Sequence, residues 1–446
     1  MFQLRNLQAD FRHLDRRHLL RVGAVGLGVG VSGWFRALAG EAAKSDKKPK
    51  KSCILLWMSG GPSTIDLWDT KPGHENGGPT KAIKTTATGL EIGEYLPEMA
   101  KWGKQFSVLR GMSTKEGDHS RATFQMRTGT LPLGGIQFPS IGSLVAKELG
   151  DPKAELPNCI SIAPQRFFSN EAFGAGFLGP NFAPLNVADG IFQMDGQNID
   201  VDKSLTVQNL TRPADVRADH GHARLELLKQ MQDDFAKTRP SGTTSAHASA
   251  YDRASRLMLS DAGKVFDLSQ EKDAVRDRYG RTLFGQGCLL ARRLVEKSVP
   301  FVEVSLGNWD THANIFAAVG TLAGQLDKAW SALIADLKDR GLLDSTLIVW
   351  MGEFGRTPKI NEGKGRDHYP NAWSSVLAGG GLKHGQAIGK TSKDGTTVEE
   401  RTTSTIDLLA TVCQALDIDS TKQNLSNVGR PIPIVDKAAE PIKELF

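Results

Sequence analysis

Short apolar runs that end directly in polar residues constrain this chain more than any other feature of its sequence. One run, residues 346–351 (TLIVWM), ends at a glycine, and Glu353 follows it. A second, residues 301–306 (FVEVSL), is followed by Asp310 and His312. Such runs are typical of strands buried on both faces of a parallel sheet. Ligands of open α/β sheets bind beyond the carboxyl ends of the strands, so both runs predict a site at that edge.

Strands and helices alternate along the rest of the chain. Further apolar runs predict strands at residues 53–58, 106–110, 159–162 and 375–378. Amphipathic patterns predict helices at residues 140–149, 222–237, 249–266, 286–297, 317–340 and 405–416. Residues 237–246 (KTRPSGTTSA) are interpreted as a flexible connection. This alternation predicts an α/β fold, a three-layer α/β/α sandwich with a mostly parallel sheet.

The N-terminus has the features of a twin-arginine export signal. Arg16 and Arg17 precede an apolar stretch at residues 22–35, and Ala37-Leu38-Ala39 offers a cleavage site. The apolar stretch is too short to span a hydrocarbon core of about 30 Å comfortably. We therefore expect the twin-arginine machinery to export the folded protein to the periplasm or the cell exterior. An uncleaved signal would instead leave a membrane tether.

The domain organisation follows from this signal. We predict a signal peptide at residues 1–39, a basic linker at 40–51 and a single α/β domain at 52–446. The signal contains six arginines and two acids, a net +4 of the chain's +5, so the mature protein is nearly neutral. Neutrality does not favour nucleic-acid binding. The four cysteines lack metal-binding spacing and are expected to be buried thiols, although one disulfide stays open in an oxidising compartment.

Two segments in the first third of the chain carry candidate chemistry. Asp66 or Asp69, after the first strand, could bind a cation, and a helix cap is the structural alternative. His119 precedes a helical run, where backbone N–H groups favour an anion, together with Ser120 and Arg121. A hydrogen-bonded loop histidine is the structural alternative for His119.

Two more segments follow the later strands. Asp310 and His312 lie at i and i+2 on one side of an extended segment, as site residues or as a structural hydrogen-bonded pair. Glu353 and the pair Asp367-His368 form the other candidate cluster. Arg356 could pair with an acid or hold a substrate anion through two hydrogen bonds.

The chain is identified by these motifs as a member of the DUF1501 family of exported bacterial proteins. The stretches that carry the resemblance are LLWMSGGPSTIDLWDTKPG, PSIGSLVAKELG, VSLGNWDTHAN, MGEFGRTPKIN and GRDHYPNAWSSVLAGGG. They occur in the expected order over residues 50–385. The family resembles the alkaline phosphatase and sulfatase superfamily, which implies an alkaline-phosphatase-like fold.

The resemblance also implies roles for the candidate residues. It implies a divalent-metal site formed by Asp66, Asp310, His312, Glu353 and His368. It places His119 or Ser120 as the catalytic group and Arg121 and Arg356 as substrate-binding groups. Oxygen and imidazole ligands suit Zn²⁺, Mn²⁺ or Fe²⁺ better than Ca²⁺.

The chain departs from the superfamily pattern at two places. His119 stands at the nucleophile position, which holds Ser, Thr or Cys in such hydrolases. Glu353 replaces the usual Asp, and Phe354 stands at the position of the next ligand. A standard nucleophile mechanism is therefore not expected.

Two functional hypotheses follow. In the first, the protein is an exported metal-dependent hydrolase of anionic esters, phosphate or sulfate, including esters on polysaccharide. In the second, it is a catalytically inactive exported binding or assembly protein that keeps a metal for structure. The retained acids and histidines favour the first hypothesis, and the altered nucleophile position favours the second.

Overall fold

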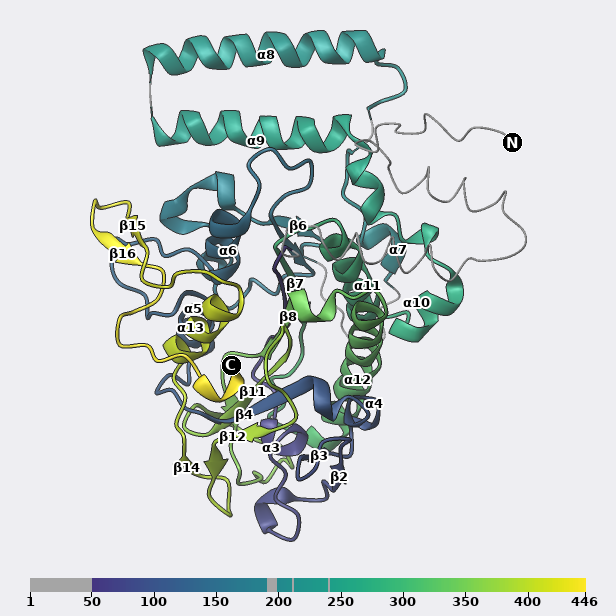
Figure 1. Ribbon diagram of the computed structural model, residues 1–446, viewed down its shortest axis with the longest axis vertical. Coiled ribbons are helices and arrows are strands. Elements are labelled where there is room, and N and C mark those ends of the chain that lie inside the picture. Colours follow the sequence, from purple (N-terminus) through teal and green to yellow (C-terminus); the bar gives the residue numbers. More distant parts are fainter. Residues whose placement is uncertain (1–49, 191–198, 211, 240) are drawn as a thin grey trace, which may run out of the picture. The chain divides into compact units, whose positions relative to one another are not determined.

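The computed structural model describes residues 50–446, with the exception of 191–198, 211 and 240 (Figure 1). The predicted signal at residues 1–39 and most of the predicted linker lie outside the described residues. Within the described part, no helix combines the length and apolar character needed to cross a bilayer.

The centre of the domain is one eight-stranded sheet. Its strands in chain order are β1 (Ser52–Met58), β4 (Phe106–Met112), β5 (Cys159–Ile162), β6 (Leu185–Val187), β7 (Phe301–Leu306), β8 (Thr346–Met351), β11 (Trp373–Gly379) and β12 (Ala387–Ile388). Their order across the sheet is β12-β4-β11-β8-β1-β7-β5-β6. Only β11 runs antiparallel to its neighbours in this sheet. The predicted strands all belong to it, which confirms a mostly parallel sheet.

Helices cover both faces of the sheet (Figure 1). The helices that pack near the sheet are α3 (Thr64–Leu67), α4 (Pro97–Ala100), α5 (His119–Thr128), α6 (Ile141–Leu149), α7 (Val201–Ser204), α10 (Asp273–Tyr279), α11 (Leu283–Glu296), α12 (Ile315–Asp339) and α13 (Thr405–Ala415). Two further helices, α8 (Ala218–Thr238) and α9 (Gly242–Leu259), pair with each other away from the sheet (Figure 1). Alternate residues of a strand face opposite sides. Accordingly, Ile54 and Leu56 of β1 share a core with α10, α11 and α12. Cys53 and Leu55 share a second core with α5, α6 and α13. The predicted three-layer arrangement is therefore confirmed.

Four short antiparallel ribbons lie outside the sheet. They pair β2 (Ala82–Lys84) with β3 (Glu91–Gly93), β9 (Gly355–Arg356) with β10 (His368–Tyr369), β13 (Lys390–Thr391) with β14 (Val398–Glu400), and β15 (Gln423–Leu425) with β16 (Pro431–Pro433). The ribbon of β9 and β10 places His368 opposite Arg356.

The prediction of a flexible connection at residues 237–246 was wrong at both ends of that range, since α8 continues to Thr238. Helix α9 already begins at Gly242, because the Ser241 hydroxyl caps it by accepting a hydrogen bond from the Thr244 N–H. The cysteines agree with the prediction of buried thiols. All four are buried and unpaired, so the disulfide left open by the sequence is not formed.

Candidate functional site

The candidate site lies at the carboxyl edge of the central strands. Asp310 and His312 follow β7, and Glu353 follows β8, the strands that flank β1 in the sheet. Because β11 is antiparallel to β8, the residues that precede β11 also lie at this edge. His368 is one of them. It therefore lies at the same edge as Asp310 and Glu353, although it precedes a strand and they follow strands.

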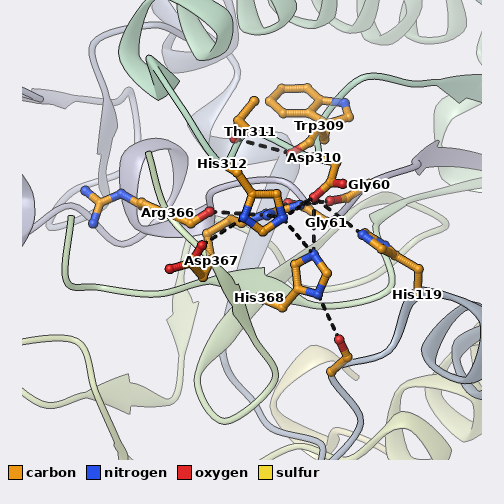
Figure 2. A network of polar contacts seen from close by, with 12 residues as sticks. Gly60, Gly61, His119, Trp309, Asp310, Thr311, His312, Arg366, Asp367 and His368 are labelled. Carbon is orange, nitrogen blue, oxygen red and sulfur yellow. Dashed lines mark hydrogen bonds and ion pairs between the residues drawn. The ribbon is translucent and has the colours of Figure 1, made fainter. Parts of the chain in front are cut away.

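Three histidines converge on one carboxylate oxygen. Figure 2 shows their rings pointing toward Asp310. Asp310 Oδ1 lies 3.4 Å from Nε2 of His119, 3.0 Å from Nε2 of His312 and 3.2 Å from Nε2 of His368. The ligand atoms of His119, Asp310 and His368 all lie within 4.8 Å of one another. We call His119, Asp310, His312 and His368 the histidine cluster.

Each ring of the cluster is fixed through its other nitrogen. The pairs are His119 Nδ1 with Glu353 Oε1 at 2.8 Å, His312 Nδ1 with Asp367 Oδ1 at 2.8 Å, and His368 Nδ1 with the Gly117 carbonyl at 2.9 Å. These oxygens accept, so each Nδ1 carries the hydrogen. In the neutral ring this leaves the Nε2 lone pair directed into the cluster, as in histidines that ligate metals.

Arg356 forms an ion pair with Asp310. Its buried guanidinium donates to Asp310 Oδ1 and to the carbonyls of Gly60, Gly61 and Arg366. Burial alone would raise the pKa of Asp310, but hydrogen bonds from His119, His368 and Arg356 hold it well below its ordinary value. Asp310 therefore favours its ionised form. Arg356 is committed to these contacts and is not placed to bind a substrate anion as the sequence suggested.

Gly60 explains why the loop after β1 needs glycine. Its φ is +109°, and a Cβ there would lie 2.5 Å from the Asp310 backbone nitrogen. Its N–H donates to Glu353 Oε1 at 2.8 Å. Glu353 thus accepts from Gly60 and His119 through Oε1, while its buried Oε2 makes no hydrogen bond, and its role as a metal ligand stays a prediction.

His119 begins α5, whose N-cap is Asp118. The ring of Phe168 stacks on the His119 ring, with a centroid distance of 4.0 Å and an interplanar angle of 8°. Burial lowers the pKa of His119, but hydrogen bonds to Asp310 and Glu353 outweigh this effect and raise it to about 9. The two carboxylates therefore favour positive charge at this ring when its Nε2 carries a proton, and a metal ion at Nε2 would have to displace that proton.

The neighbours of His119 point elsewhere. Ser120 is exposed. The exposed Arg121 side chain pairs with Glu116, with 2.9 Å between Nε and Oε2. Neither residue is part of the histidine cluster, so their predicted roles gain no support from its geometry.

Asp66 lies outside the cluster as well. Its fully buried carboxylate accepts hydrogen bonds from Arg366 Nε at 2.9 Å and Arg366 Nη2 at 3.0 Å. Ser63 and Thr80 donate to the same carboxylate. Figure 2 shows the Arg366 guanidinium pointing away from the histidines. The four hydrogen bonds saturate Asp66, which contradicts the idea of a ligand in this cluster.

Sequence reasoning missed Arg366, Phe168 and the Gly117 carbonyl. Arg366 directly precedes Asp367-His368, and this adjacency was its only signal. Phe168 follows β5, and a phenylalanine carries no ligand or titratable atom that would mark a site in a sequence. A backbone acceptor such as Gly117 leaves no side-chain signature in a sequence.

The chain is similar to solved structures of the alkaline phosphatase and sulfatase superfamily, as its motifs led us to expect. They include the PsFucS1 sulfatase from Pseudoalteromonas sp., with 14% identity, a TM-score of 0.39, and coverage of 85% of this chain and 70% of that chain. A protein in the alkaline phosphatase superfamily from Vibrio parahaemolyticus has 13% identity, a TM-score of 0.40, and coverage of 84% and 68%. The phosphonate monoester hydrolase SpPMH from Silicibacter pomeroyi has 15% identity, a TM-score of 0.36, and coverage of 83% and 74%.

At such TM-scores these likenesses do not decide the activity of this chain. Among curated proteins, none matches the sequence. One family model, described as "Protein of unknown function (DUF1501)", matches residues 50–446, which is nearly the whole chain. The chain therefore belongs to the DUF1501 family.

Proposed function

We propose that this protein is an exported metal-dependent hydrolase of anionic esters, phosphate or sulfate, including esters on polysaccharide. The observation that carries the proposal is the convergence of three Nε2 atoms on Asp310 Oδ1. Export rests on the twin-arginine motif at Arg16 and Arg17.

The donor set fits a divalent metal. Two ligands of a tetrahedral ion with bonds of 2.0–2.1 Å lie about 3.3–3.4 Å apart. His119 and His368 lie 3.4 Å and 3.2 Å from Asp310, close to this spacing. We therefore assign Nε2 of His119, Oδ1 of Asp310 and Nε2 of His368 as the ligands. Two imidazoles and one carboxylate suit Zn²⁺, Mn²⁺ or Fe²⁺.

Solvent exposure favours a catalytic over a structural metal. Structural zinc sites are closed by four protein ligands, whereas catalytic sites have three and an open position. The side chains of Asp310 and His312 are 39% and 46% exposed, so the cluster opens to solvent on one side. A metal bound there would polarise the ester and lower the pKa of a water molecule bound to it.

His312 is suited to transfer a proton at this open side. Its Nε2 lies 3.0 Å from Asp310 Oδ1 and 3.1 Å from His368 Nε2. Asp367 accepts its Nδ1–H at 2.8 Å and so fixes the ring orientation. A histidine oriented by a carboxylate is a common general acid or base. Arg356 keeps Asp310 in place and ionised, and Glu353 accepts the Nδ1–H of His119 and so fixes the orientation of that ring.

Metal analysis combined with hydrolysis of aryl phosphate and aryl sulfate tests the proposal. His368→Ala should lose both metal and turnover. His312→Ala should retain metal and lose about 10²- to 10⁴-fold in kcat, the usual contribution of a general acid or base. His220→Ala, at an exposed position of α8, is the matched control and should behave as wild type.

The outcome also separates the two hypotheses. Wild-type protein that binds metal but hydrolyses neither ester, with His312→Ala indistinguishable from it, would favour the binding or assembly protein. Protein without stoichiometric metal would contradict both versions of the metal site.

A further inference from the structure

A row of aromatic rings leads from the histidine cluster to the surface. Phe168 stacks on His119 at 4.0 Å, and Phe167 contacts Phe168 with a centroid distance of 4.0 Å and an interplanar angle of 43°. The Phe167 side chain is 59% exposed. Phe354 closes the inner side of the cluster, 4.9 Å from His119 and 4.7 Å from His368. The cluster is therefore bounded by the ring of Phe354 on its inner side, and the exposed ring of Phe167 lies beside it at the surface.

The segment that carries the two phenylalanines is anchored at the same edge of the sheet as Asp310. It follows β5, which pairs with β7. Gln165 is buried, and a Cβ on Gly307 would lie 3.1 Å from its side chain, so this segment packs on the loop after β7. Arg166 donates to both carboxylate oxygens of Asp189. These contacts hold the rings in place before a ligand binds, which limits the entropy lost on binding.

We propose that Phe167 and Phe168 form a subsite for a six-membered ring on the alcohol side of the ester, either a pyranose or an aryl ring, whose face would lie on the aromatic side chains. This inference rests on the proposed function, because the anionic group of the ligand must occupy the histidine cluster. When the anionic group of an ester lies in the histidine cluster, its alcohol portion must lie outside the cluster. Phe167 and Phe168 are next to the cluster and are therefore placed to contact that portion. Aromatic rings attract one another in offset-stacked or edge-to-face arrangements beyond the area that they bury, and the C–H face of a pyranose can pack on an aromatic ring through dispersion. An alcohol portion without a ring would forgo this contact.

The test compares non-hydrolysable ligands that differ only in the ring. Binding of methylphosphonate, phenylphosphonate and glucose-6-phosphonate to the metal-loaded full chain is measured by calorimetry, and the affinity ratio of each ring ligand to methylphosphonate is calculated. In Phe167→Ala at least one ratio should fall by about 2- to 10-fold, the size of a typical aromatic pair contact. Phe167→Trp should keep or raise that ratio. Phe235→Ala, an exposed phenylalanine of α8, is the matched control and should leave both ratios as in wild type.

The outcomes are distinguishable. A loss confined to the glucose ligand identifies a carbohydrate subsite, and one confined to the phenyl ligand identifies an aryl subsite. Methylphosphonate binding with both ratios unchanged in Phe167→Ala overturns the subsite and leaves the proposed function standing. Failure of all three phosphonates and of the corresponding three sulfonates, which resemble sulfate esters, to bind the metal-loaded protein overturns the subsite together with the anion site of the proposed function.

Discussion

Replacing Asp66 by asparagine separates a structural role from a metal-binding role. The Asp66 carboxylate accepts two hydrogen bonds from Arg366, at 2.9 and 3.0 Å, and both side chains are fully buried. Ser63 and Thr80 add two more, at 2.5 and 3.0 Å. Asparagine keeps the size but removes the charge, so the Arg366 guanidinium stays buried without its counter-ion.

The structure therefore predicts a large loss of stability. Removal of one partner of a buried ion pair costs about 3–5 kcal/mol. Native proteins are stable by only about 5–15 kcal/mol, so Asp66→Asn should lose a large share of its unfolding free energy. Urea unfolding followed by circular dichroism measures this change, and mass spectrometry of the folded fraction measures its metal. We expect normal metal content in the folded fraction.

Asp367→Asn is the matched control because it should show the opposite pattern. The Asp367 side chain is 57% exposed, so the unfolding free energy of Asp367→Asn should differ from that of the wild type by no more than about 1 kcal/mol. Asp367 also orients His312. Asp367→Asn should instead lower turnover, because the His312 ring loses the carboxylate that orients it. If Asp66→Asn instead lost its metal while its unfolding free energy stayed at the wild-type value, Asp66 would be a ligand and the structural reasoning would be refuted.

Three further predictions concern separate parts of the chain. Burial lowers the pKa of His384 below its ordinary value of 6.5, so the neutral ring contributes to stability above pH 6.5, and this contribution is lost as the pH falls through the folded-state pKa. Urea unfolding from pH 5 to 8 should show this loss of stability in the wild type and not in His384→Gln. Identical pH dependence in the two proteins would contradict the prediction. Gly60→Ala should lower both metal content and melting temperature, because its Cβ would meet the Asp310 backbone at a strained positive φ, and a fully metal-loaded variant would count against this geometry. Arg16→Lys combined with Arg17→Lys should keep the precursor in the cytoplasm, as cell fractionation would show, and unchanged export would rule out the twin-arginine interpretation.

The sequence by itself determined the six longest strands of the sheet, most of the longer helices and the position of most candidate residues along them. Continuous apolar runs report burial on both faces, so the strands at residues 301–306 and 346–351 were predictable without knowledge of their neighbours. The brevity of the loops after them also fixed Asp310 and Glu353 near the carboxyl edge. These are local properties, which a linear pattern can carry.

Only the tertiary structure decided which residues meet. β4 lies beside β11 in the sheet although a large part of the chain separates them, and the antiparallel direction of β11 is what carries His368 to the site. Asp66 and Glu353 both follow buried strands, yet one pairs with Arg366 and the other fixes His119. The identity of a partner depends on distances of 3 Å between side chains from distant segments, and no spacing along the chain encodes those distances.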